Sequence, residues 1–313
     1  MDCRTALLNT PTAKLKIGLA LGSGASRGWS HIGTIKALLR EGIEPDIVCG
    51  TSVGAMIGAC YLSGNLEKLE KWVLGSTRTD VYKFFKVKLG QSGFVDSDRL
   101  RKFLHENVAA PELEIENMPK PFVAIATDLD NGREVWLQKG NLADAVRASM
   151  ALPGLFPAVR HNDRWLVDGG LVNPVPVSTC RALGADVVIA INLNADVINP
   201  RPQKKPEPED NEKKGVLQKV KETTIEYSSA IIPSGNKEEE SPGLFAAITN
   251  SINIVQDRIT RSRLAGDPAE VTISPRLAHI GMFEFHRAGE AIAEGESCVR
   301  NSMEAIRKAL GKS

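Results

Sequence analysis

The sequence lacks an excess of charge of either sign, any paired cysteine motif and any cluster of histidines. Its 39 basic side chains almost balance its 38 acidic ones, so the net charge of +1 gives no global reason to expect nucleic-acid binding. The five cysteines are scattered and no C-x-x-C pair occurs, which argues against a disulfide framework and against a zinc site. With no HxxH or HExxH pattern either, we expect no metal and no cofactor.

Long apolar runs are missing as well. Residues 1–16 have no apolar core of the kind found in secretory signals, and the run at 17–21 is far too short to span a bilayer. Isolated thiols are typical of a reducing compartment. The sequence therefore predicts a cytoplasmic protein.

What the sequence does contain is a regular alternation of short apolar runs and helical patterns over its first two-thirds. This alternation predicts an α/β fold, with a mostly parallel central sheet covered by helices on both faces. The expected strands are 16–21, 46–49, 122–126, 134–137 and 187–191, and the expected helices are 27–39, 53–62, 141–150 and 176–183.

A G-x-S-x-G motif, Gly50-Thr51-Ser52-Val53-Gly54, stands between an expected strand and an expected helix. A sharp turn in this context projects the serine hydroxyl away from the sheet, and the flanking glycines relieve crowding. The helix that follows directs the positive end of its dipole at Ser52, which favours developing negative charge. By itself the motif also fits a tight strand–helix turn with an incidental serine.

A glycine-rich loop comes earlier, between the first expected strand and helix. It comprises Gly22, Ser23, Gly24, Ala25, Ser26, Arg27 and Gly28. Backbone N–H groups at a helix N-terminus form an anion site. The third glycine is one place late for the dinucleotide pattern G-x-G-x-x-G, and no Gly-Lys-Ser/Thr ending marks a P-loop. An oxyanion hole fits better, with the amides of Gly24 and Ala25 as donors and the Arg27 guanidinium fixing the loop.

The third motif is Asp168-Gly169-Gly170, which follows the apolar run 165–167. Alone it fits an ordinary turn. A serine hydroxyl needs an adjacent base, and burial would raise the pKa of an aspartate enough to serve as one. The three motifs together favour attack by Ser52, with Asp168 as proton acceptor and an acyl-enzyme intermediate. A Ser-His-Asp triad stays open as the alternative mechanism, although no histidine adjoins the serine motif; the histidines are His31, His105, His161, His279 and His286.

The stretches GLALGSGASRGWSHIG, GTSVG, ASMALPGLFPAV and WLVDGGLVNPVPV together resemble bacterial patatin-like phospholipases, in the branch that includes the catalytic domain of neuropathy target esterase. The resemblance covers residues 17–193. It implies a patatin-like three-layer fold and a Ser–Asp dyad that hydrolyses acyl esters of phospholipids or lysophospholipids, with Ser52 as nucleophile, Asp168 as base and the glycine-rich loop as oxyanion hole. Many members have four consecutive glycines where this chain has Gly22, Ser23, Gly24 and Ala25.

The resemblance leaves two other functions open. One is a different acyl transfer on the same dyad, by a thioesterase or an acyltransferase, and the other is a regulatory protein with a vestigial site. The expected partner is a lipid substrate. Contact with a membrane surface is a further hypothesis from Tyr82–Lys88, where aromatics alternate with lysines, a pattern that also fits an ordinary amphipathic element. The apolar segment Ser149–Phe156 fits either an acyl pocket wall or a buried core turn.

The composition divides the chain into three regions. Residues 17–193 form the expected patatin-like catalytic domain. Residues 199–242 are rich in Pro, Lys and Glu and cannot bury enough apolar surface to offset chain entropy, which predicts a mobile linker. Residues 243–313 form a mainly helical C-terminal region, with helices expected at 244–264 and 287–310 and a strand at 270–274, that we expect to dock on the catalytic domain. The sequence does not indicate an oligomeric state.

Overall fold

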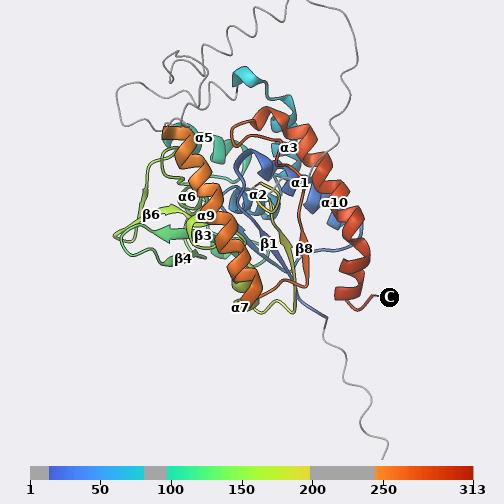
Figure 1. The fold of residues 1–313 in the computed structure, drawn as a ribbon. Helices are drawn as coiled ribbons and strands as arrows, with labels where there is room; N and C mark the ends of the chain where they lie inside the picture. The colour runs from blue at the N-terminus through green and yellow to red at the C-terminus, as the bar shows by residue number, and fades with distance from the viewer. Residues whose placement is uncertain (1–13, 81–96, 198–243, 313) are drawn as a thin grey trace, which may run out of the picture.

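The computed structural model describes residues 14–80, 97–197 and 244–312. Two sequence predictions, the linker at 199–242 and the amphipathic segment Tyr82–Lys88, lie outside these residues. The described strands are β1 Ile17–Leu21, β2 Ile47–Thr51, β3 Phe122–Asp128, β4 Glu134–Leu137, β5 Val159–His161, β6 Arg164–Asp168, β7 Val187–Ile191 and β8 Val271–Ile273. The described α-helices are α1 Ser30–Arg40, α2 Val53–Leu62, α3 Leu66–Gly75, α5 Ser97–Asn107, α6 Leu142–Ser149, α7 Val177–Ala182, α9 Leu244–Gly266 and α10 Ala288–Ala309 (Figure 1).

The eight strands form one mixed sheet in the order β5-β6-β3-β2-β1-β7-β8, with β4 paired to β3. Strands β3, β2, β1, β7 and β8 run parallel to one another, which confirms the prediction of a mostly parallel sheet. The antiparallel pairs are β3–β4 and β5–β6, which short turns connect, and β3–β6, whose strands are far apart in the sequence. Between β5 and β6 the two turn residues, Asn162 and Asp163, have φ angles of 46° and 60°, as two-residue hairpin turns require.

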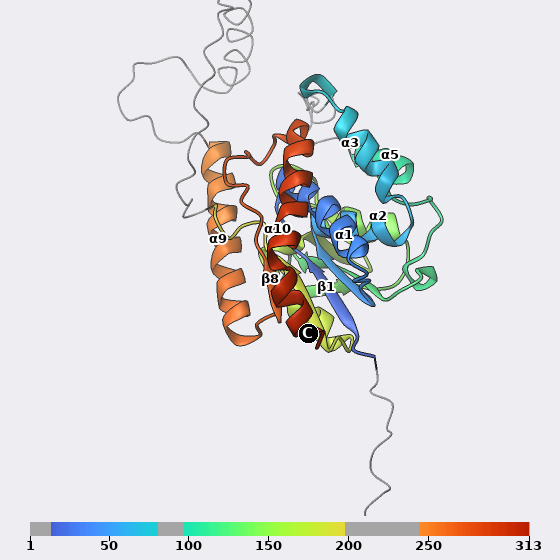
Figure 2. The same ribbon diagram turned by 90° about the vertical axis from the view of Figure 1, so that its right-hand side faces the viewer.

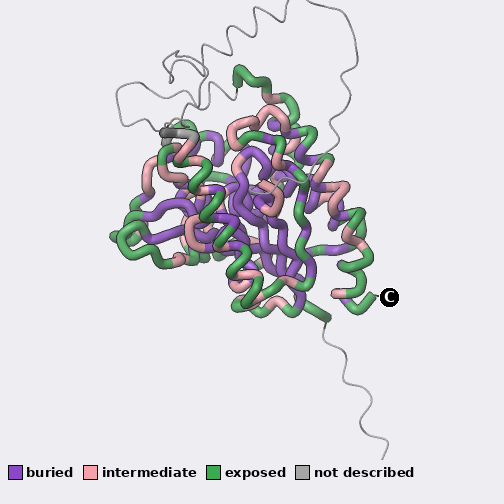
Figure 3. The backbone as a smooth tube through the Cα atoms, in the orientation of Figure 1, coloured by how far each residue is buried: buried purple, intermediate pink, exposed green. Residues whose placement is uncertain are grey.

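Helices cover both faces of this sheet, as the sequence predicted. Side chains alternate along each strand, so in β1 Leu19 and Leu21 pack toward α1, α2 and α10, whereas Ala20 packs on the face covered by α7 and the C-terminal end of α9. Figure 2 shows α9 on one side of the sheet and α1 and α10 on the other. Strands β1, β2, β3 and β7, which lie between these layers, are buried along their whole length (Figure 3).

The segment after residue 243 is built into this architecture. Strand β8 extends the sheet by pairing with β7, and α10 packs along α1. The two helices approach so closely that a Cβ on Gly33 would lie 2.0 Å from the carbonyl oxygen of Ile292, and a Cβ on Gly295 would lie 2.1 Å from that of Ser30. The three domain boundaries stay a prediction.

Two differences from the expected elements affect the site. The helix expected from residue 27 begins earlier, as a 3-10 turn over Ala25–Trp29 that continues into α1. The helices α3 and α5 were not predicted from the sequence. Both come to line an apolar pocket near the G-x-S-x-G turn.

Candidate active site

Ser52 occupies a strained turn between β2 and α2, at φ 57° and ψ −123°. Such a backbone costs a residue with a Cβ on the order of 1–3 kcal/mol, and it persists only where the surroundings impose it. The flanking glycines are required by close contacts: a Cβ on Gly54 would lie 2.2 Å from the Leu21 carbonyl oxygen, and one on Gly50 would lie 2.5 Å from the Ala55 nitrogen. The Ser52 N–H donates to the hydroxyl oxygen of buried Ser149 at 2.8 Å.

Asp168, at the end of β6, faces the Ser52 hydroxyl directly. The Ser52 hydroxyl donates to Oδ2 of Asp168 at 2.6 Å, and the Gly170 N–H donates to Oδ1 at 2.7 Å. The Asp168 residue is only 1% exposed. Burial raises the pKa of its carboxyl from 3.8 to about 6, because desolvation outweighs the two hydrogen bonds that stabilise the charged form. The glycine after it, Gly169, is also required sterically, since a Cβ there would lie 2.2 Å from the Ile125 carbonyl oxygen.

Of the residues expected to form the oxyanion hole, Gly22, Ser23, Gly24, Ala25, Arg27 and Gly28, two have backbone N–H groups that the loop's neighbours engage. The N–H of Gly22 donates to the Ile191 carbonyl at 3.1 Å, and that of Ser23 donates to the Pro174 carbonyl at 2.9 Å. Both amides are therefore engaged in holding the loop to its neighbours. Gly28 has a packing role instead, because a Cβ there would lie 2.3 Å from Val53 Cγ2 on α2.

Gly24 and Ala25 remain as the candidate backbone donors. In the described part of the chain no hydrogen bond engages either N–H group. The Gly24 carbonyl accepts from the Arg27 backbone N–H at 3.1 Å and from Arg27 Nε at 3.2 Å, as expected of a guanidinium that fixes the loop. Burial lowers the pKa of Arg27 to about 10, which still leaves it cationic at neutral pH. Ala25 sits at φ 49°, where glycine would be unstrained.

These groups surround one small pocket of about 270 Å³. Its walls come from all three sequence motifs, from the segment after α6, from α9 and from the loop before α10. The lining residues are Ser23, Gly24, Ala25, Arg27, Ser52, Leu152, Asp168, Ile252, Gln256 and Met282.

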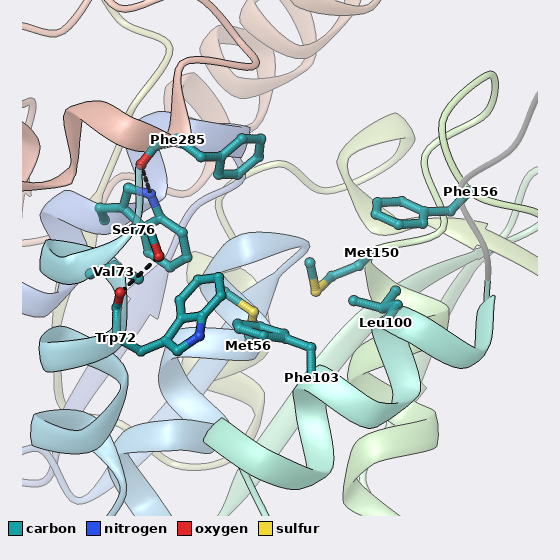
Figure 4. A pocket seen from close by; sticks show the side chains of 10 residues that line it. Met56, Trp72, Val73, Ser76, Leu100, Phe103, Met150, Phe156 and Phe285 are labelled. Carbon is teal, nitrogen blue, oxygen red and sulfur yellow. Dashed lines mark hydrogen bonds between the residues drawn. The ribbon is translucent and has the colours of Figure 1, made fainter. Parts of the chain in front are cut away.

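A second, apolar pocket of about 550 Å³, partly open to solvent, lies around Met56, one helical turn after Ser52 in α2. Figure 4 shows Met56, Met150 and Phe103 pointing into a common space, which Trp72 also borders. The segment Ser149–Phe156, for which the sequence left open a pocket wall or a buried core turn, contributes residues to both. Met150 and Phe156 line the apolar pocket, whereas the Ser149 hydroxyl is buried and donates to the Ile125 carbonyl.

All five histidines lie within the described residues, and none lines the pocket around Ser52. His31 comes nearest to the motifs, because its Nε2 lies 2.8 Å from the Gly22 carbonyl oxygen. It is fully buried, and burial lowers its pKa to about 4, so it is neutral at physiological pH. Its contact with the Gly22 carbonyl and its burial fit a packing role rather than a catalytic one.

Gln256 and Asn194 are the polar residues near the site that the motif analysis missed. Gln256 lines the pocket from α9, and Asn194 contacts the loop from just beyond β7. The only signal in the sequence is a run of polar residues at helical spacing in α9, and such a run ordinarily marks a solvent-exposed face.

The part of the chain that contains the three motifs is also the part that matches a known family. Residues 19–181, slightly more than half of the chain, match the family model for patatin-like phospholipase. The chain belongs to the patatin-like phospholipase family. This family generally comprises lipid hydrolases, and the mixed sheet with helices on both faces is consistent with its three-layer fold.

The similar proteins include members from bacteria and mammals. An uncharacterized NTE family protein of Mycobacterium bovis is 28% identical, over 98% of this chain and 96% of that protein. The mouse patatin-like phospholipase domain-containing protein 6 is 31% identical, over 57% of this chain and 14% of that protein. Among solved structures, that of VipD from Legionella pneumophila matches over 96% of this chain and 79% of the VipD chain. The two sequences are 13% identical there, and the TM-score is 0.37.

No helix among the described residues is both long and apolar enough to cross a bilayer. No group of three or more His, Cys, Asp or Glu side chains among them could hold a metal ion.

Proposed function

We propose that the protein is a serine lipid acyl hydrolase that cleaves carboxylic esters of phospholipids or lysophospholipids through a Ser52–Asp168 dyad. The observation that carries this proposal is the 2.6 Å hydrogen bond from the Ser52 hydroxyl to a fully buried carboxylate. The raised pKa of that carboxylate makes it a stronger base than a solvated aspartate while it stays ionised at neutral pH. No imidazole stands between the two side chains, which favours a dyad over a triad.

In the first half of the reaction, Asp168 takes the proton of the Ser52 hydroxyl as its oxygen attacks the ester carbonyl. The carbonyl oxygen becomes an oxyanion, which the N–H groups of Gly24 and Ala25 stabilise. Collapse of this intermediate breaks the ester bond, and the leaving alcohol takes the proton back from Asp168. Water then attacks the acyl-enzyme in the same way, with Asp168 as base, and releases the fatty acid.

The apolar pocket supports a lipid acyl group as the substrate. Apolar and aromatic side chains almost completely line it, and Met56 and Met150 belong to segments that also contact Ser52. An acyl chain bound there would bury apolar surface, which contributes about 25 cal/mol per Å². The cationic Arg27 beside the dyad would add favourable potential for a developing oxyanion.

The first test compares the purified chain with its Ser52→Ala variant on phospholipid, lysophospholipid, monoacylglycerol and acyl thioester. We expect Ser52→Ala to lose at least about 10³-fold in ester hydrolysis, because it removes the attacking oxygen. It should also fail to react with a fluorophosphonate probe. Ser251→Ala, at an exposed position of α9, is the matched control and should keep full activity.

The outcomes separate the candidate functions. Full ester hydrolysis by Ser52→Ala would end the nucleophile assignment. Turnover of thioesters alone would replace the proposed function with that of a thioesterase, and a wild-type chain inert to both substrates and probe would indicate a vestigial site.

A further inference from the structure

The buried side chains in the middle of helix α9 are polar, whereas several of its apolar side chains are exposed. Four buried polar residues follow one helical face, and they are Asn253, Gln256, Asp257 and Thr260. In contrast, Ile248, Ile254 and Val255 are each at least 40% exposed. Because burying a polar group is unfavourable unless it is hydrogen-bonded, the contacts of this inner face call for an explanation.

Gln256 makes the contacts that reach the site. It is 5% exposed, and its Oε1 accepts from the Ser23 hydroxyl at 3.1 Å and from Asn194 Nδ2 at 3.0 Å. The Nε2 of Gln256 lies against Gly170, in the turn that follows Asp168. The contact is so close that a Cβ added to Gly170 would lie 2.4 Å from this nitrogen. Gln256 therefore touches both the glycine-rich loop and the turn that carries Asp168.

These contacts bear on the direction of the Gly24 N–H. Asn194 Nδ2, which Gln256 holds, also lies 3.5 Å from the Ser23 carbonyl oxygen and 3.4 Å from its hydroxyl. In a planar trans peptide the C=O and the following N–H point in opposite directions. A donor on the Ser23 carbonyl therefore turns the Gly24 N–H away from Asn194.

Arg27 fixes the next peptide in the same manner. Its Nε donates to the Gly24 carbonyl, so the Ala25 N–H is directed away from the guanidinium. The two candidate oxyanion donors are thus each oriented through the carbonyl of their own peptide. Arg27 belongs to the loop itself, whereas Gln256 comes from a helix more than two hundred residues later in the chain.

We propose that Gln256 is a positioning residue of the active site, which acts through Ser23 and Asn194 to hold the Gly24 N–H in place for the oxyanion. This inference rests on the proposed hydrolase function. It assigns α9, which lies outside the residues matched by the family model, a direct part in completing the oxyanion hole.

The test uses the full chain with Gln256→Met, which keeps the length of the side chain but removes its hydrogen bonds. We expect kcat to fall by about ten- to a hundredfold, because a small displacement of a donor is enough for such a loss. KM should change by less than about threefold, since the interaction is made with the transition state. The rate of fluorophosphonate labelling of Ser52 should fall by a similar factor.

Thr260→Val is the matched control on the same buried face, one turn further along α9. Thr260 is 2% exposed and its hydroxyl has no hydrogen-bond partner among the described residues. Valine therefore preserves the shape of the side chain and removes no hydrogen bond. We expect wild-type kcat. Ser23→Ala should reproduce the loss of Gln256→Met from the opposite side of the contact, and it tests the proposal even if Gln256→Met proves too unstable to purify.

The double variant tests whether Gln256 and Ser23 act through the same contact. If Gln256 acts through Ser23, Gln256→Met combined with Ser23→Ala should be no slower than the slower single variant. Losses that multiply, or wild-type kcat in Gln256→Met, would overturn the proposal while leaving the hydrolase function standing. A wild-type chain without hydrolysis or labelling would instead refute the proposed function, and this inference with it.

Discussion

Replacing Asp168 by asparagine should abolish activity and at the same time stabilise the protein at neutral pH. The wild-type carboxylate is completely buried and must lose its proton there at the expense of folding stability. The difference between a pKa of about 6 in the folded chain and 3.8 in the unfolded one is equivalent to about 3 kcal/mol. Asparagine retains an acceptor for the Gly170 N–H but has no charge to desolvate.

The sign of the effect follows from proton linkage. Because folding raises the pKa of Asp168, its contribution to stability is fully present below pH 3.8 and is lost as the pH rises through about 6. The variant has no such loss. The free energy of unfolding of Asp168→Asn minus that of the wild type should therefore grow by about 2.4 kcal/mol between pH 4 and pH 7, most of the full difference.

Urea unfolding of both proteins at a series of pH values measures this difference directly. The buried His31, whose pKa folding lowers to about 4, destabilises both proteins equally as the pH falls and so cancels in the subtraction. Asp163→Asn, at a side chain that is 94% exposed, controls for the chemical change. A difference that stays constant across the pH range would refute the claim that Asp168 titrates in a desolvated environment.

Hydrolysis by Asp168→Asn should fall by about 10³-fold or more, because an amide cannot accept the Ser52 proton.

Three further predictions concern the same site. In the wild type, kcat/KM should rise with pH and level off above a midpoint near pH 6, as Asp168 becomes a base; a flat profile from pH 4 to pH 8 would contradict this. Ser149→Ala should lower kcat at least about tenfold and the free energy of unfolding by about 1–3 kcal/mol, since it leaves the Ser52 N–H without its acceptor; kinetics and urea unfolding would detect either change. Ala25→Gly should change the free energy of unfolding by less than about 0.5 kcal/mol, because the relief of backbone strain at positive φ offsets the greater entropy of the unfolded chain. The control Ala293→Gly, at an exposed position of α10, should lower the free energy of unfolding by about 1 kcal/mol. Equal losses in urea unfolding of the two variants would show that Ala25 is unstrained.

The residues of the candidate site could be predicted from the sequence because each belongs to a local pattern. A serine in G-x-S-x-G and an aspartate before two glycines each indicate a sharp turn at a strand end, and Gly50, Gly54 and Gly169 prove sterically necessary because a Cβ on any of them would meet backbone atoms. The parallel strands β1 and β2 bring the glycine-rich loop and Ser52 to one edge of the sheet. Asp168 reaches the same edge differently, because β6 runs antiparallel to β3 in a register that places Asp168 opposite Ala126.

The strand and helix boundaries of the central sheet followed from periodicity, which is a local pattern as well. Strand β5 has only three residues, which is too short to show a period. Helices α3 and α5 do have apolar residues at helical spacing, Leu66, Leu69 and Val73 in α3 and Leu100, Phe103 and Leu104 in α5, and the prediction from sequence missed them.

The sequence alone thus determined the α/β fold, the motif residues and the family, all of which are encoded by neighbours in the chain. Only the tertiary structure decided which amides of the glycine-rich loop remain available, because Gly22 and Ser23 donate to carbonyls of Ile191 and Pro174, far away in sequence. It also decided which face of α9 is buried. Hydrophobic patterning assumes that the interior a helix meets is apolar, whereas the interior that α9 meets is a polar active site, where Gln256 finds the hydrogen bonds that it would otherwise have made with water.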